Sequence, residues 1–323
     1  MENTYNSLAP GYWRGALQLV PKEIVGGLAE KSLSEIANNK LEEITPDELP
    51  FIFELIYDDE ANFHLEIING SERIRVDSII HGHSRKTGKD SIVIFFPVYE
   101  SYIKAFYNGN VMQGEWVVTT KENYSIPFTA HNGRNQRFTD LTKAPMMDVS
   151  GKWACTFGLD GEDPYPAIGE FQQSGNKVTG TFRTETGDYR FLEGSIQEDK
   201  LYLSCFDGAH AFLFEAKILE DQSMIGSFRS GKHYRTTWEA KKEDSAQLGD
   251  PDSLTYLLDG YETIEFAFEN ENGEVISLDN PAYQDKIKIV QIFGTWCPNC
   301  RDETEFLTSY LRDQPNEDLA VIA

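Results

Sequence analysis

The chain has 323 residues, enough for two or three domains, and 40% of them are hydrophobic, which can supply the cores. Its 53 acidic residues outnumber 29 basic ones, so the net charge is −24. A surface this acidic repels phosphate groups, which argues against nucleic acid as a partner and against docking on anionic membranes.

Residues 1–138 form the first predicted module, which is rich in β structure. The runs 51–55 and 63–68 alternate apolar and polar residues, as strands with one buried face do. The pair Asn69-Gly70 is a turn signal that follows them. The stretch 21–49 breaks this pattern with helix-like runs, so we predict a helical insert there.

The second predicted module, residues 148–242, repeats signals of the first in the same order along the chain. Chance supplies one such match readily but hardly five in order, so we predict an internal duplication. Each copy is expected to be an antiparallel meander that forms a small barrel or sandwich. The matched stretches are 11–13 with 151–153, 90–94 with 199–203, 101–106 with 208–213, 114–116 with 226–228, and 124–130 with 234–240.

Residues 261–323 change character after an acidic linker. The run 287–293 is apolar and β-branched, which predicts a strand buried on both faces. Apolar residues at helical spacing follow it, and a second apolar strand begins at Leu319. The fold class we predict is therefore a mainly β region of two repeated modules followed by the start of an α/β domain.

The motif Cys297-Pro298-Asn299-Cys300 lies at the predicted start of that helix. Unpaired N–H groups and the helix dipole favour negative charge there, so the pKa of a cysteine can fall from about 8.5 to values between about 3.5 and 7. The spacing brings the second thiol beneath the first, where it can attack a mixed disulfide. We predict thiol–disulfide exchange with Cys297 as nucleophile and Cys300 as resolving thiol.

Two neighbours of the cysteines suit this chemistry. Pro298 fits the first helical turn, where its missing N–H costs nothing, and Trp296 would shield and shape the surface around the pair. A zinc half-site is the alternative interpretation, but no second Cys-x-x-Cys or His pair completes it. We therefore predict neither a metal nor a cofactor.

The stretch 289–301, Ile-Val-Gln-Ile-Phe-Gly-Thr-Trp-Cys-Pro-Asn-Cys-Arg, resembles the TlpA/ResA-like thiol–disulfide oxidoreductases of the thioredoxin superfamily. The resemblance covers residues 261–323, and the β modules are similar to N-terminal extensions of such proteins in Bacteroidetes. It implies an envelope protein facing the periplasm, often lipid-anchored, that acts on protein thiols and disulfides. It also implies a membrane thiol–disulfide carrier as the upstream reductant.

The sequence departs from this family in two places. Thioredoxins carry a buried Asp six residues before the first Cys, and here that place is held by Gln291, which cannot take a proton. We predict it, with Trp296 and Pro298, as a supporting residue of the site. The family's cis-Pro lies past residue 323, so we expect the redox domain to be partial. The first residues lack the features of a signal peptide, which is compatible with a cytosolic protein or with a leader already removed.

Two other functions compete with protein-disulfide exchange. A peroxiredoxin-like antioxidant enzyme shares the fold, but its Cys normally follows a Thr at a spacing that Thr295-Trp296-Cys297 lacks. A non-enzymatic role is the other: the β modules would bind a ligand or partner beside an incomplete redox domain.

Several further residues admit two interpretations each. Cys155 and Cys205 could form a disulfide or remain as buried free thiols, and the residues leave both open. His81 and His83 could bind a metal, but we expect a solvated loop. Four tryptophans could line a binding cleft, but we expect them in the core: Trp13, Trp116, Trp153 and Trp238.

Overall fold

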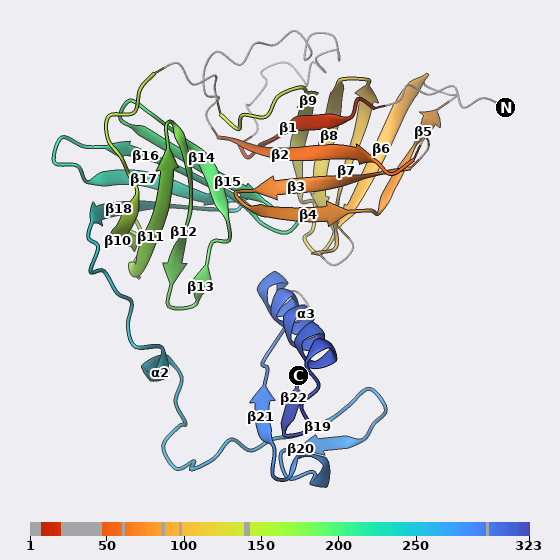
Figure 1. The fold of residues 1–323 in the computed structure, drawn as a ribbon, viewed down its shortest axis with the longest axis vertical. Helices are drawn as coiled ribbons and strands as arrows, with labels where there is room; N and C mark the ends of the chain where they lie inside the picture. The colour runs from red at the N-terminus through yellow and green to blue at the C-terminus, as the bar shows by residue number, and fades with distance from the viewer. Residues whose placement is uncertain are drawn as a thin grey trace. The chain divides into compact units, whose positions relative to one another are not determined.

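The computed structural model describes residues 8–20, 47–59, 62–84, 88–96, 99–138, 143–294 and 297–323. The chain divides into two compact units, one ending at Gly249 and the other beginning at Asp250. Strands dominate the first unit (Figure 1), which confirms the predicted mainly β class. Most of the insert predicted at 21–49 lies outside the described residues, and Glu48 and Leu49 belong to a strand.

The first half of this unit is a nine-stranded antiparallel sheet. Its strands are β1 (Gly11–Gln18), β2 (Glu48–Tyr57), β3 (Phe63–Asn69), β4 (Glu72–Val76), β5 (Ile79–Ser84), β6 (Lys89–Phe96), β7 (Ser101–Asn108), β8 (Val111–Val118) and β9 (Ser125–Asn132). They lie in the order β4-β3-β2-β1-β9-β8-β7-β6-β5. Buried residues alternate with more exposed ones along β6 and β7, as the period of a strand requires.

The second half is a sheet that closes on itself. Its strands are β10 (Gly151–Phe157), β11 (Tyr165–Ser174), β12 (Lys177–Thr184), β13 (Gly187–Asp188), β14 (Leu192–Gln197), β15 (Lys200–Phe206), β16 (Ala211–Ile218), β17 (Met224–Ser230) and β18 (Tyr234–Lys242). They lie in the order β11-β10-β18-β17-β16-β15-β14-β12-β13, and β11 also pairs with β12. That extra pairing makes a barrel around an aromatic core.

The two sheets repeat one topology, as the duplication predicts. The order β2-β1-β9-β8-β7-β6-β5 in the first sheet corresponds to β11-β10-β18-β17-β16-β15-β14 in the second. Trp13 and Trp153 open the two copies, and both are fully buried. Each indole Nε1 donates a hydrogen bond to the carbonyl four residues earlier, that of Ala9 at 2.9 Å and that of Val149 at 2.8 Å.

Strand register corrects one of the five matched stretches. Across three strands the first copy aligns Ala105, Gly114 and Phe128, and the second aligns Ala216, Gly226 and Trp238. Ala105 therefore corresponds to Ala216, and the match of 101–106 with 208–213 is wrong. Alternating apolar patterns look alike at several offsets along a strand, so a comparison of short stretches alone can match the wrong positions.

A side chain from the second sheet completes the core of the first. Phe206, the last residue of β15, is fully buried. Its ring centroid lies 4.4 Å from that of Phe51, 5.2 Å from that of Trp116 and 5.8 Å from that of Phe96. Residues of the second sheet therefore belong to the hydrophobic cluster of the first, while the barrel keeps a separate aromatic core.

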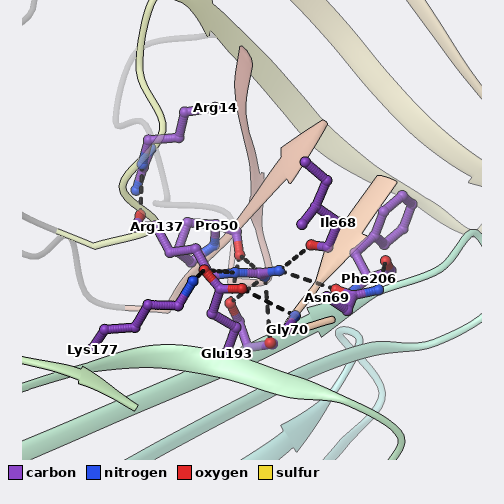
Figure 2. A network of polar contacts seen from close by, with 10 residues as sticks. Arg14, Pro50, Ile68, Asn69, Gly70, Arg137, Lys177, Glu193 and Phe206 are labelled. Atoms are coloured by element: carbon purple, nitrogen blue, oxygen red, sulfur yellow. Dashed lines mark hydrogen bonds and ion pairs between the residues drawn. The ribbon is translucent and has the colours of Figure 1, made fainter. Parts of the chain in front are cut away.

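A buried arginine joins the same two sheets (Figure 2). Arg137 donates from Nη1 to the Pro50 carbonyl at 3.3 Å and to Ser204 Oγ at 3.1 Å, and from Nη2 to Asn69 Oδ1 at 3.1 Å. Its Nε lies 3.9 Å from a carboxylate oxygen of Glu193. Burial lowers the pKa of Arg137, and the negative charge of Glu193 acts in the opposite direction. The guanidinium thus bridges backbone and side chains that are distant in sequence.

The second unit contains short strands and helices. They are α2 (Pro251–Leu254), β19 (Ala267–Glu269), β20 (Val275–Ser277), the 3-10 helix η2 (Pro281–Tyr283), β21 (Ile287–Val290), α3 (Pro298–Asp313) and β22 (Leu319–Ile322). β19 and β20 form a hairpin, and β21 pairs in parallel with β22, with α3 between them in the chain.

The strand predicted at 287–293 is shorter and more exposed than expected. β21 ends at Val290, and Ile292 beyond it is 93% exposed. The prediction of burial on both faces is wrong because β21 has one described neighbour, β22, in a two-stranded sheet. Among the described residues, no helix has the length and apolar character needed to cross a membrane.

Candidate active site

Cys297 and Cys300 form a disulfide at the N-terminus of α3, with their Cα atoms 5.3 Å apart. Cys297 is the capping residue just before the helix, and its Sγ accepts a hydrogen bond from the Cys300 backbone N at 3.2 Å. Pro298 takes the first helical position, where no N–H is needed. The two cysteines predicted for exchange are therefore already joined at a helix start.

The surroundings of Cys297 favour a negative charge on its sulfur. The first turn of α3 contains no acidic residue, so its unpaired N–H groups meet no competing carboxylate there. Both cysteines are only partly buried, which leaves the disulfide open to attack from solvent. A thiolate at Cys297 would be stabilised by the same backbone N–H that its sulfur accepts here.

Gln291 lies directly after β21 and is 8% exposed. Its side-chain Nε2 donates to the Cys300 carbonyl at 3.0 Å and to the Glu303 carboxylate at 3.1 Å. Its Oε1 accepts from Thr304 Oγ1 at 3.0 Å. The supporting residue named from the sequence is thus in contact with the helical turn that carries the resolving cysteine.

Sequence reasoning missed Glu303 and Thr304. Thr304 Oγ1 also contacts the Cys300 carbonyl at 2.7 Å, so it belongs to the same cluster. The available signal was helical spacing, since residues three and four positions after Cys300 lie on its face of the helix. Trp296, which we expected to shield the pair, lies outside the described residues.

Cys155 and Cys205 are both free and buried, so the bridged alternative is wrong. Burial raises the pKa of Cys155 to about 12, and it raises the pKa of Cys205 well above the ordinary thiol value. Neither thiol offers a thiolate near neutral pH. Thiol chemistry in the described chain therefore falls to the Cys297–Cys300 pair.

Among the described residues, buried apolar side chains pack the interior of each β module. The four tryptophans named from the sequence are at most 2% exposed, which confirms them as core residues. Within the first sheet, a void of about 10 Å³ is lined by apolar side chains, room for about one water molecule. A larger groove of about 550 Å³ follows β11 and β12, with Lys152, Glu170 and Phe191 among its walls.

His81 and His83 lie on β5 and not in the solvated loop that we expected. His83 Nδ1 is 2.7 Å from the carboxylate of Asp90, and the ring of His81 packs against Phe63 with centroids 5.1 Å apart. The described residues hold no group of three or more His, Cys, Asp or Glu placed to bind a metal ion. These histidines therefore have structural roles in the sheet.

Comparisons with known proteins give no assignment. No family model and no curated protein matches the chain. One similar solved structure is a protein of unknown function from the DUF3598 family of Nostoc punctiforme, 12% identical, with a TM-score of 0.21, covering 72% of this chain and 94% of that one. Another is a "putative outer membrane protein" from Bacteroides fragilis, 10% identical, with a TM-score of 0.21, covering 72% of this chain and 96% of that one. TM-scores this low carry no argument about function.

Proposed function

We propose that the protein is a thiol–disulfide oxidoreductase that acts on protein disulfides through Cys297 and Cys300. The observation that carries the proposal is the disulfide between these residues at the N-terminus of α3, with Cys297 as the helix cap. The inert character of the two other cysteines supports it, because both are buried and have raised pKa values.

The proposed reaction transfers two electrons. In the reduced protein, the Cys297 thiolate attacks one sulfur of a partner disulfide, forming a mixed disulfide and releasing the other partner sulfur as a thiolate that takes a proton from water. The Cys300 thiolate then attacks Cys297 Sγ, which closes the intramolecular disulfide and releases the second partner thiol. The partner is reduced to a dithiol, and this protein is oxidised.

A return to the dithiol form needs two electrons from a second dithiol. We propose a membrane thiol–disulfide carrier as that donor and the periplasmic face of the cell envelope as the location, with a lipid anchor as one means of attachment. These proposals rest on the resemblance of residues 289–301 to TlpA/ResA-like proteins, with residues 261–323 as the start of a thioredoxin-like domain. The same resemblance supports protein thiols and disulfides as partners.

The test is reduction of insulin disulfides by the dithiol-reduced protein. We expect Cys297→Ser to abolish reduction, because the attacking sulfur is gone. We expect Cys300→Ser to accumulate a mixed disulfide with the partner, because attack succeeds while release fails. Cys155→Ala is the matched control and should keep the activity. Unchanged reduction by Cys297→Ser would refute the proposed function.

A further inference from the structure

The amide of Gln291 connects the end of β21 to the first two turns of α3. Its backbone N donates to the Ile322 carbonyl at 2.9 Å, which fixes the residue on the two-stranded sheet. Its side chain reaches Cys300, Glu303 and Thr304 on the helix. We propose that Gln291 is a positioning residue for the resolving cysteine and favours closure of the Cys297–Cys300 disulfide. This inference rests on the proposed function.

The hydrogen bonds are compatible with only one orientation of the Gln291 side-chain amide. Its two N–H groups are used by the Cys300 carbonyl and the Glu303 carboxylate, and its oxygen faces the Thr304 hydroxyl, whose single proton is shared with the Cys300 carbonyl. A flipped amide would direct its oxygen at two acceptors and lose both bonds. With 8% exposure, little water is available to replace them. The cluster therefore holds the Cys300 turn at a fixed place on the sheet.

An ordered Cys300 turn affects closure of the Cys297–Cys300 disulfide, the second step of exchange. It does not affect the attack of Cys297 on the partner disulfide, the first step. Closure of the disulfide depends on the effective concentration of the Cys300 sulfur at Cys297, which rises when the intervening turn is ordered. Attack by Cys297 on a partner depends on the N–H groups at the helix start, and the Gln291 side chain bonds to the Cys300 carbonyl and not to the Cys300 N–H that faces Cys297 Sγ. Loss of the amide should consequently weaken closure while Cys297 keeps its reactivity.

The test compares Gln291→Leu with wild type in equilibrium with reduced and oxidised glutathione. We expect the equilibrium constant for forming the internal disulfide to fall about tenfold, which is a rise of about 30 mV in reduction potential. The alkylation rate of Cys297 in the reduced protein should stay within twofold of wild type. Gln284→Leu, a matched change at an exposed site of the same unit, should alter neither quantity.

Gln291→Glu supplies a second measurement if the Leu variant fails to fold. Its carboxyl group can donate to the Cys300 carbonyl only when protonated, and the nearby Glu303 carboxylate favours protonation. We expect the internal disulfide of this variant to be near wild-type stability at low pH and weaker at high pH. Two results would overturn the inference: an equilibrium constant within twofold of wild type for Gln291→Leu, or, for Gln291→Glu, a ratio to the wild-type constant at the same pH that does not change with pH. Glutathione equilibrium needs no protein partner, so a failure to reduce insulin defeats the proposed function alone.

Discussion

Single polar residues at the junction of the two sheets show how a charged side chain is stabilised in the interior. Asp207 is fully buried, and its carboxylate accepts from the backbone N of Ala209 at 2.8 Å and of His210 at 2.6 Å. It also lies 3.3 Å from Nε of Arg190. Burial raises the pKa of Asp207, but the hydrogen bonds and charges of His210 and Arg190 outweigh it, so the pKa lies below its ordinary value.

The lowered pKa of Asp207 predicts a specific pH dependence of stability. A depressed carboxyl pKa contributes stability that is present above the unfolded value of about 3.9 and is lost as the pH falls through the folded value. We expect urea unfolding to show a smaller loss of stability from pH 5 to pH 3 in Asp207→Asn than in wild type. Asp163→Asn, at an exposed site, serves as the control. Equal pH slopes for wild type and Asp207→Asn would contradict this account.

At the scale of elements, local patterns predicted the strands well. Alternating apolar residues marked β2 and β3, and the shared opening motifs at Trp13 and Trp153 predicted the repeat. Contacts between residues distant in sequence were beyond such patterns. The closing pair β11–β12 and the insertion of Phe206 into the first core both depend on how strands meet in space.

At the candidate site, too, local features could be predicted from the sequence, and contacts between residues distant in sequence could not. The cysteine spacing and Pro298 predicted a helix start, because capping chemistry is local. Gln291 was named as a supporting residue from its place in a family pattern and not from any contact. Its hydrogen bonds to Glu303 and Thr304 needed the packing of α3 on β21, which the sequence does not specify.

The repeated glycine of β8 and β17 predicts a steric effect on strand pairing. A Cβ placed on Gly114 would lie 1.9 Å from the Lys104 carbonyl oxygen, and one on Gly226 would lie 2.2 Å from that of Glu215. We expect Gly114→Ala to lower the free energy of unfolding by about 1–3 kcal/mol, because neighbouring backbone must move. Gly82→Ala, whose Cβ would meet nothing within 4 Å, should be neutral or slightly stabilising. Chemical denaturation of both variants measures the difference, and equal stabilities would count against the repeated close approach.

On the scale of the whole molecule, the two sheets behave as one unit because side chains of the second enter the core of the first and a buried polar network contacts both. Phe206 belongs to the second sheet but packs in the cluster of the first, and Arg137 bonds to both (Figure 2). Removing either contact should therefore destabilise both sheets. The unit that begins at Asp250 has its own small sheet and helix.

Phe206→Ala tests this coupling. We expect it to lower the free energy of unfolding by about 3–5 kcal/mol, as for other buried aromatic residues. Native-state hydrogen exchange should show reduced protection in both the β1–β9 sheet and the β10–β18 sheet. Tyr102→Ala, a partly exposed aromatic on β7, is the comparison and should cost less. Loss of protection confined to one sheet would show that the two sheets fold independently.

The central claim, that Cys297 is an activated nucleophile at a helix start, is tested most directly by its alkylation rate against pH. The measurement uses the reduced Cys300→Ser variant, with reduced Cys297→Ser to report Cys300. We predict that Cys297 alkylates faster than Cys300 at neutral pH and titrates with a pKa clearly below the ordinary value of about 8.5. A Cys297 that titrates near about 8.5, and reacts no faster than Cys300, would contradict the account.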